Sequence, residues 1–226
     1  FRQGKIAVAC FATNVARLQS IALAAEKNGR AVALAGRSLW RIYEAAKENG
    51  YLLDVKPFLQ PQAAAMLPGE NVCYICTGSQ GEPRSALARI ARGDYADITL
   101  ETGDTVLFSS RVIPGNEKSI SRLQNDLAQK GVRVITDRDA AIHVSGHPAQ
   151  EELEAMYAWV KPRTAIPVHG EARHLQAHAR LAEACQVPQA LVIGNGTIVT
   201  LSGQKAEIAG TVPTGRLALH GTSLVS

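Results

Sequence analysis

The chain has 226 residues, of which 46% are hydrophobic and 19% are charged. This composition excludes a globally disordered chain, and the length suffices for one large domain or for one and a half ordinary ones. The net charge of +4 mildly favours the binding of polyanions. An ordinary basic surface has a similar charge, so charge alone does not indicate nucleic-acid binding.

Apolar β-type runs alternate with amphipathic helical segments along most of the chain. Strands are expected at 5–11, 31–35, 71–76, 105–110, 132–136 and 164–168. Helices are expected at 14–29, 38–50 with Ser38 as the N-cap, 82–92, 117–130, 149–160 and 171–185. Such alternation implies right-handed crossovers and a mostly parallel α/β sheet that is buried on both faces.

Three segments do not follow this alternation. Residues 54–69 contain three prolines and are expected to cross the fold irregularly, while 142–145 (IHVS) is a short β-type run. The dipeptide Asn195-Gly196 within LVIGNGTIVTL predicts a hairpin, the one clear antiparallel signal.

The four cysteines are expected to be reduced thiols of a cytoplasmic protein. Cys73 and Cys76 form a C-x-x-C, but they lie in NVCYIC, which reads as a buried central strand rather than as the turn of a zinc or thioredoxin-like site. No apolar run approaches the roughly 18 residues that a membrane-spanning helix requires. We therefore expect no membrane attachment.

Four polar, glycine-bearing turns each lead into an expected helix. They are CTGSQGEP (76–83), SSRVIPGNEKS (109–119), HVSGHPAQ (143–150) and PVHGE (167–171). Parallel strands bring such turns to one edge of a sheet, and the N-termini of helices favour anions such as phosphate. Taken one at a time, these glycines, serines and prolines are equally typical of ordinary turns and caps.

The ordered set of these four turns resembles the ribonuclease J family, a bacterial branch of the β-CASP group within the metallo-β-lactamase superfamily. FATNVARLQ (11–19) and ALAGRS (33–38) are similar to the beginning of that family's β-CASP region, and the resemblance extends over about 5–202. It implies a flavodoxin-like β-CASP domain at 1–139, with helices on both faces of the sheet. The C-terminal part of the lactamase domain would follow at 140–202. An exit segment toward a linker or a further domain would occupy 203–226.

The resemblance also assigns catalytic and metal-binding residues. The family's acidic motif falls on Glu82, and its first histidine motif falls on His147, at the end of HVSGH. Its second histidine motif falls on His169, which the resemblance implies is a ligand to one of two zinc ions. His147 would stabilise charge on the scissile phosphate, and Glu82 would orient it. Read alone, His147 could equally be a helix N-cap, Glu82 a first-turn acid and His169 a packed core residue.

RNA-contacting residues follow from the same resemblance. The HVSGH turn approaches RNA phosphate in the family, and the segment that begins SSRVIPGNE lines its RNA channel. These motifs implicate His143, Ser145, Gly146, Ser109, Ser110 and Asn116. By contrast, His174 and His178 are spaced like a helical zinc pair but lack the glutamate of H-E-x-x-H, so we expect them on a solvated or partly packed helix face.

The family's main metal motif, H-x-H-x-D-H, is absent from the sequence. Each zinc ion needs about three or four protein ligands, and the resemblance supplies one, His169. We therefore expect a β-CASP insert plus a returning lactamase segment, with two zinc ions in the complete enzyme and an incomplete site or none in this chain. Alone, the chain is expected not to cleave RNA.

The resemblance implies a zinc-dependent ribonuclease that acts on single-stranded RNA in processing and decay, with endonuclease and 5′-exonuclease activity, as a homo-dimer or tetramer. A non-catalytic α/β module that binds phosphate or nucleotides is the alternative from another functional class. A relative acting on DNA or on a small phosphoester is a third hypothesis.

Overall fold

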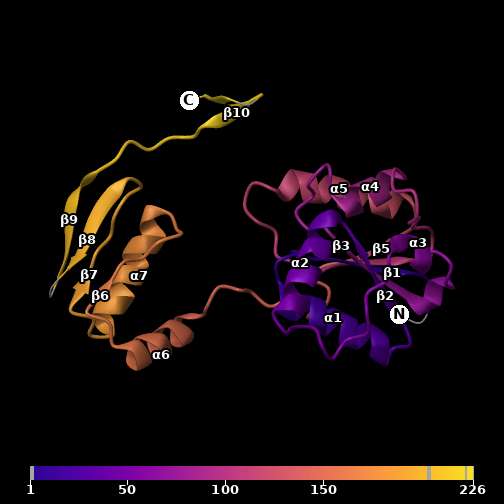
Figure 1. Cartoon of the computed structure of the whole chain (residues 1–226), viewed down its shortest axis with the longest axis horizontal. Helices are drawn as coiled ribbons and strands as arrows, with labels where there is room; N and C mark the ends of the chain where they lie inside the picture. The colour runs from indigo at the N-terminus through magenta and orange to yellow at the C-terminus, as the bar shows by residue number, and fades with distance from the viewer. Residues whose placement is uncertain (1–2, 203–204, 222, 226) are drawn as a thin grey trace. The chain divides into compact units, whose positions relative to one another are not determined.

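The computed structural model describes residues 3–202, 205–221 and 223–225. The chain divides into two compact units, Phe1–Ser145 and Gly146–Ser226, called the N-terminal and C-terminal units below (Figure 1). Among the described residues, no helix combines the length and apolar character needed to cross a membrane.

The N-terminal unit alternates strands and helices as its sequence predicts. Its strands are β1 (Ile6–Ala9), β2 (Ala31–Ala35), β3 (Val72–Cys76), β4 (Thr105–Phe108) and β5 (Arg133–Ile135). Its helices are α1 (Val15–Lys27), α2 (Arg37–Glu48), α3 (Pro61–Ala64), the 3-10 turn η1 (Gly69–Asn71), α4 (Ala86–Arg92) and α5 (Glu117–Gln129).

Within the described residues, the five strands form one parallel sheet in the order β2-β3-β1-β4-β5. The expected α/β class and parallel sheet are confirmed. The order differs from the 2-1-3-4-5 of flavodoxin in one respect, because β3 rather than β1 lies beside β2. The connection from β1 through α1 to β2 therefore skips one strand position in the sheet, and β3 occupies that position.

Helices cover both faces of this sheet. Alternate strand residues such as Val8, Leu34 and Ile75 pack toward α1 and α2, whereas their neighbours, including Tyr74 and Phe108, pack toward α4 and α5 (Figure 1). Both sets are buried, which explains why the strands lack polar alternation. Each fully buried large apolar side chain stabilises the fold by about 1.5–3 kcal/mol.

The proline-rich crossing protects the edge of the sheet. Leu59 exchanges backbone hydrogen bonds with β2: its N–H donates to the carbonyl of Val32, and its carbonyl accepts from Leu34. The crossing was expected to be irregular, and it contains only the four-residue α3 and the turn η1. Because unpaired strand edges invite association, this cover keeps β2 from being an open edge.

Two helices begin elsewhere than predicted. The N-cap of α2 is Gly36, with a positive φ of 133°, so the expected cap at Ser38 was wrong and Ser38 lies inside the helix. Helix α4 begins at Ala86 rather than near residue 82, with Ser85 as its N-cap accepting a hydrogen bond from the Ala88 N–H. The residues between β3 and Ser85 form a turn, and Glu82 therefore lies in this turn rather than in the helix.

The C-terminal unit contains α6 (Gln150–Val160), β6 (Thr164–Ala165), α7 (Ala172–Ala184), β7 (Gln189–Ala190), β8 (Thr197–Ser202), β9 (Lys205–Thr211), β10 (Ala218–His220) and β11 (Ser223–Val225). Strands β6 and β7 pair in parallel, and α7 connects them. A small core of Ala165, Ala182 and Val187, with Tyr157 and Ala190 packed against it, joins these elements.

The predicted hairpin at Asn195-Gly196 was wrong. These residues form a turn between β7 and β8, which belong to different sheets, and the antiparallel partner of β8 is β9. The β8–β9 pairing therefore extends past position 202, where the lactamase part was expected to end. Residues 203–204, 222 and 226 of the expected exit segment lie outside the described residues. The expected domain bounds stay a prediction.

Candidate functional site

The carboxyl ends of β1, β3 and β4 meet at one edge of the sheet in the N-terminal unit. From β1 the chain runs to β2, beyond β3, whereas from β4 it runs to β5 on the opposite side. Connections that leave two neighbouring strands in opposite directions create a crevice between them, and this is where open α/β sheets bind ligands. The β1–β4 crevice is therefore the favoured location for a site in this unit.

The turn after β3 approaches α5 closely. Gly81 has a positive φ of 73°, and a Cβ atom there would lie 2.5 Å from the backbone carbon of Ser119. Glu82 follows with its side chain exposed, and its Oε2 accepts a hydrogen bond from the backbone N–H of Gln80 at 3.1 Å. The turn thus presents an oriented carboxylate to solvent.

Gln80 ties this turn to the loop after β4. Its side chain is buried, and its Nε2 donates to the carbonyl of Arg111 at 2.9 Å and to Oγ of Ser110 at 3.5 Å. Its Oε1 accepts from the Ile113 N–H at 3.0 Å and from Nδ2 of Asn116 at 3.2 Å. One amide thereby fixes the loop that carries three of the predicted RNA-contacting residues.

The two predicted serines of that loop are buried. Ser109 donates its hydroxyl hydrogen to the carbonyl of Ile142, and Ser110 donates to the carbonyl of Ser79 at 3.3 Å. Their hydroxyls therefore bond to protein backbone, whereas Asn116 is partly exposed. Of the three, Asn116 is the one whose side chain also reaches solvent.

Residues 142–144 form no strand, so the expected β-type run was wrong; Arg17 holds them instead. Nη1 of Arg17 donates to Oγ of Ser109 at 2.7 Å, to the carbonyl of Ile142 at 3.3 Å and to Nδ1 of His143 at 3.1 Å. Nη2 donates to the carbonyl of Val144 at 3.2 Å. Burial first, and then the charge of Arg17, lower the pKa of His143 below its ordinary value.

Sequence reasoning assigned no role to Arg17 or Gln80. Arg17 stands within the quoted FATNVARLQ, three residues after the helix N-cap Asn14, whose side chain accepts the Arg17 N–H at 3.0 Å. A cation in the first turn of a helix interacts unfavourably with the helix dipole. The position of Arg17 was therefore a signal in the sequence that its side chain has a specific partner.

In the C-terminal unit, the two predicted catalytic and metal-binding histidines lie together. The rings of His147 and His169 stack with centroids 5.7 Å apart and planes 14° from parallel. Both side chains are exposed. His147 precedes the N-cap of α6, Ala149, and His169 precedes the N-cap of α7, Glu171, so neither caps its helix. Ser145 and Gly146, also exposed, lead to His147.

The other two histidines of this unit's helices have structural partners. Nδ1 of His174 accepts the backbone N–H of Glu171 at the start of α7, and Nε2 of His178 lies 2.8 Å from the hydroxyl of Tyr157 on α6. His174 thus caps the N-terminus of α7, and His178 joins α7 to α6.

Among the described residues, no group of three or more histidine, cysteine, aspartate or glutamate side chains could hold a metal ion. Since a zinc ion takes about three or four protein ligands, the stacked pair does not fit a complete zinc site. The pair can contribute donors to a site but cannot form one alone.

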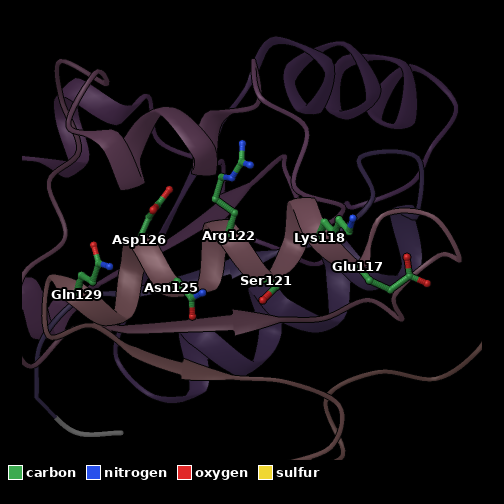
Figure 2. Close-up of a pocket in the computed structure, with 7 residues that line it drawn as sticks. All are labelled: Glu117, Lys118, Ser121, Arg122, Asn125, Asp126 and Gln129. Carbon is green, nitrogen blue, oxygen red and sulfur yellow. The ribbon is translucent and has the colours of Figure 1, made fainter.

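A shallow depression lies elsewhere, over α5. Figure 2 shows side chains of both charges along this helix: Glu117, Lys118, Ser121, Arg122, Asn125, Asp126 and Gln129. None belongs to the predicted site, and opposite charges share the surface, so it has no preference for an anion such as RNA.

Comparison with known proteins matches both parts of the chain to families. Residues 3–127 match "Ribonuclease J, beta-CASP domain", and residues 131–188 match "Zn-dependent metallo-hydrolase RNA specificity domain". The chain is 45% identical to ribonuclease J of Sinorhizobium meliloti and 43% identical to that of Mycolicibacterium smegmatis, in each case over 97% of its length. It is 37% identical to ribonuclease J2 of Bacillus subtilis over 97% of its length. It spans 39–40% of the length of these relatives.

Proposed function

Because the chain belongs to the ribonuclease J family, we propose that it forms the RNA-positioning part of a zinc-dependent enzyme that hydrolyses the phosphodiester bonds of single-stranded RNA. The observation that carries this proposal is the stacked pair of His147 and His169 at the starts of α6 and α7. Two exposed imidazoles that hold each other in place suit a phosphate-handling centre better than a core.

The two histidines have different roles in this proposal. His169 supplies one zinc ligand, and the remaining ligands come from parts of the complete protein outside this chain. His147 donates a hydrogen bond to a non-bridging oxygen of the scissile phosphate, where negative charge grows in the transition state. The stacked ring of His169 limits rotation of His147, which reduces the entropy lost on reaching that geometry. Glu82 has the acidic catalytic role that the family's motif implies.

RNA is also bound by residues outside the histidine pair. His143, Ser145 and Gly146 contact backbone phosphates, and Asn116 contacts the strand from the loop after β4. Ser109 and Ser110 support the RNA-contacting segments from inside, because their hydroxyls donate to the backbone carbonyls of Ile142 and Ser79. The complete protein acts in the cytoplasm as a homo-oligomer and cuts RNA both internally and from the 5′ end.

The test is a cleavage assay with the protein encoded by the complete gene. Single-stranded RNA, duplex RNA, single-stranded DNA and a small phosphodiester are offered to the unaltered protein and to His147→Ala, with His220→Ala in the exposed C-terminal tail as the matched control. We expect cleavage of single-stranded RNA that is lost in His147→Ala and kept in the control.

Cleavage of DNA or of the small ester alone would replace RNA as the substrate. Binding of RNA without any hydrolysis by the complete protein would favour the non-catalytic module.

A further inference from the structure

The segment 142–144 is bonded to residues that follow β1 and β4, the two strands from which the chain leaves in opposite directions. The carbonyl of Ile142 accepts the hydroxyl of Ser109, the first residue after β4, and Arg17 reaches the same place from α1, the helix after β1. A peptide that carries His143 therefore lies beside a sheet position that commonly receives a ligand.

One guanidinium joins three parts of the N-terminal unit. Arg17 bonds to Ser109, 92 positions away, and to Ile142, His143 and Val144, which are 125–127 positions away. The two hydrogens of Nη1 are shared among Ser109, Ile142 and His143, and Nη2 donates to Val144. The ammonium group of lysine cannot reproduce this planar arrangement. The contacts fix both the backbone and the ring of His143.

The contact also selects a tautomer. Arginine has donors and no acceptor, so the contact between Nη1 and Nδ1 of His143, at 3.1 Å, is a hydrogen bond when Nδ1 accepts. In the neutral ring the hydrogen then resides on Nε2, the nitrogen on the opposite side from Arg17. His143 is half-buried, so the ring keeps an accessible side.

We propose that Arg17 is a positioning residue for RNA binding: it docks 142–144 into the β1–β4 crevice and holds His143 as an Nε2–H donor for an RNA phosphate. This rests on the proposed function in one respect, the contact of His143 with RNA. The docking and the tautomer are properties of the chain alone.

The surroundings of His143 agree with a neutral donor. Burial first, and then the charge of Arg17, lower its pKa; the Ser109 backbone and Asp137 oppose them with smaller effects, and Arg111 adds the smallest lowering effect. A ring with the ordinary histidine pKa would instead be partly protonated near neutral pH and would carry hydrogens on both nitrogens.

The first experiment reads the tautomer without RNA. Long-range ¹H–¹⁵N spectra of the full 226-residue chain would be recorded at pH 7.5 for the unaltered protein, Arg17→Gln, Arg17→Lys and the control Arg41→Gln, an exposed arginine of α2. His143→Ala assigns the signal. We expect the Nε2–H form in the unaltered chain and the control, and a mixture of tautomers in both Arg17 variants. An unchanged tautomer in Arg17→Gln would overturn the proposal.

The second experiment measures the dissociation constant for a single-stranded oligoribonucleotide. Arg17→Gln and His143→Ala should each weaken binding, on the order of tenfold for one lost charge-assisted contact, and the double variant should weaken it no further. Losses that multiply in the double variant would show that Arg17 contacts RNA itself and would overturn the positioning role. If the unaltered chain binds no RNA, the proposed function and the RNA step fail together, while the spectra still decide whether Arg17 sets the tautomer.

Discussion

The imidazole rings of His147 and His169 are stacked face to face, 5.7 Å apart and 14° from parallel, although 22 positions separate them in the sequence. The geometry depends on backbone as well as side chain, because His169 adopts a left-handed φ of 61° that is uncommon for a residue other than glycine. Such conformations cost free energy and cluster at functional sites. Substitutions of these two histidines should therefore distinguish a zinc ligand from a residue that contacts the scissile phosphate.

In the complete protein, His169→Ala should reduce both bound zinc and RNA cleavage, since His169 is the proposed ligand. His147→Ala should keep the zinc and lower the single-turnover rate, on the order of 10²-fold for a lost transition-state contact. Metal analysis beside single-turnover kinetics on the same preparations makes the comparison.

His174→Ala is the matched control, because His174 lies on α7 and serves its N-terminus. Equal loss of zinc in His147→Ala and His169→Ala would make both residues ligands. Full activity in both would return the two turns to a structural role.

The buried amide of Gln80 should matter for stability. Gln80→Ala leaves the Ile113 N–H without its acceptor and the Asn116 amide without its partner, so we expect a loss of about 1–3 kcal/mol in the free energy of unfolding. Urea denaturation of the unaltered chain, Gln80→Ala and the exposed control Gln129→Ala measures it. A Gln80→Ala variant as stable as the control would mean that the loop after β4 is held by other contacts.

Two glycines offer a comparison of strain with steric clash. Gly81 and Gly93 both have positive φ, 73° and 84°, so alanine is strained at either position. Only at Gly81 would the added Cβ meet backbone, at 2.5 Å, whereas at Gly93 the nearest atom is 3.8 Å away. Gly93→Ala should lower the free energy of unfolding by about 1–2 kcal/mol. Gly81→Ala should lower it by about 1–3 kcal/mol more. Equal midpoints in a urea titration would contradict the close approach to α5.

The sheet of the N-terminal unit was predictable because its signals are local. The strand at 31–35 matches β2 residue for residue, and the apolar runs of the other four strands bracket them within two residues at each end. Continuous burial and helical periodicity are both written in short windows of sequence. The four polar turns were likewise visible as turns.

The parts that failed depend on distant partners. IHVS has β-type composition, but no strand among the described residues pairs with it, and Arg17 from 125 positions away bonds to Ile142 instead. Asn195-Gly196 does make a turn, yet β7, the strand before it, pairs with β6. Local turn chemistry thus predicted where the chain reverses but not which strands it joins. Arg17 and Gln80 were overlooked for the same reason.

The thiols of the N-terminal unit should be unreactive in the folded chain. Burial raises the pKa of Cys10 and of Cys73 to about 12, and it raises that of Cys76 as well, so almost no thiolate exists at pH 8. We expect one thiol, the partly exposed Cys185, to react with a disulfide reagent in the native chain, and four after denaturation. Rapid labelling of two or more native thiols would count against the central position of β3.

The last prediction concerns acid sensitivity at His143. Its pKa is lowered on folding, chiefly by burial and then by Arg17, so the folded chain binds fewer protons than the unfolded chain just below pH 6.5. Stability then rises with pH through this window and falls as the solution is acidified below the ordinary histidine value. The unaltered chain should lose stability relative to His143→Asn between pH 7.5 and pH 5.5, because all other titrating groups are shared.

Urea denaturation of both proteins at the two pH values tests this. Arg17→Gln supplies the internal check: without the guanidinium the pKa of His143 moves back toward its ordinary value, and the extra acid sensitivity shrinks without disappearing, since burial remains the larger cause. A stability difference between the unaltered chain and His143→Asn that does not change with pH would show that His143 titrates alike in the folded and unfolded chain. A difference that grows in acid in favour of the unaltered chain would reverse the sign and make His143 a stabilised cation.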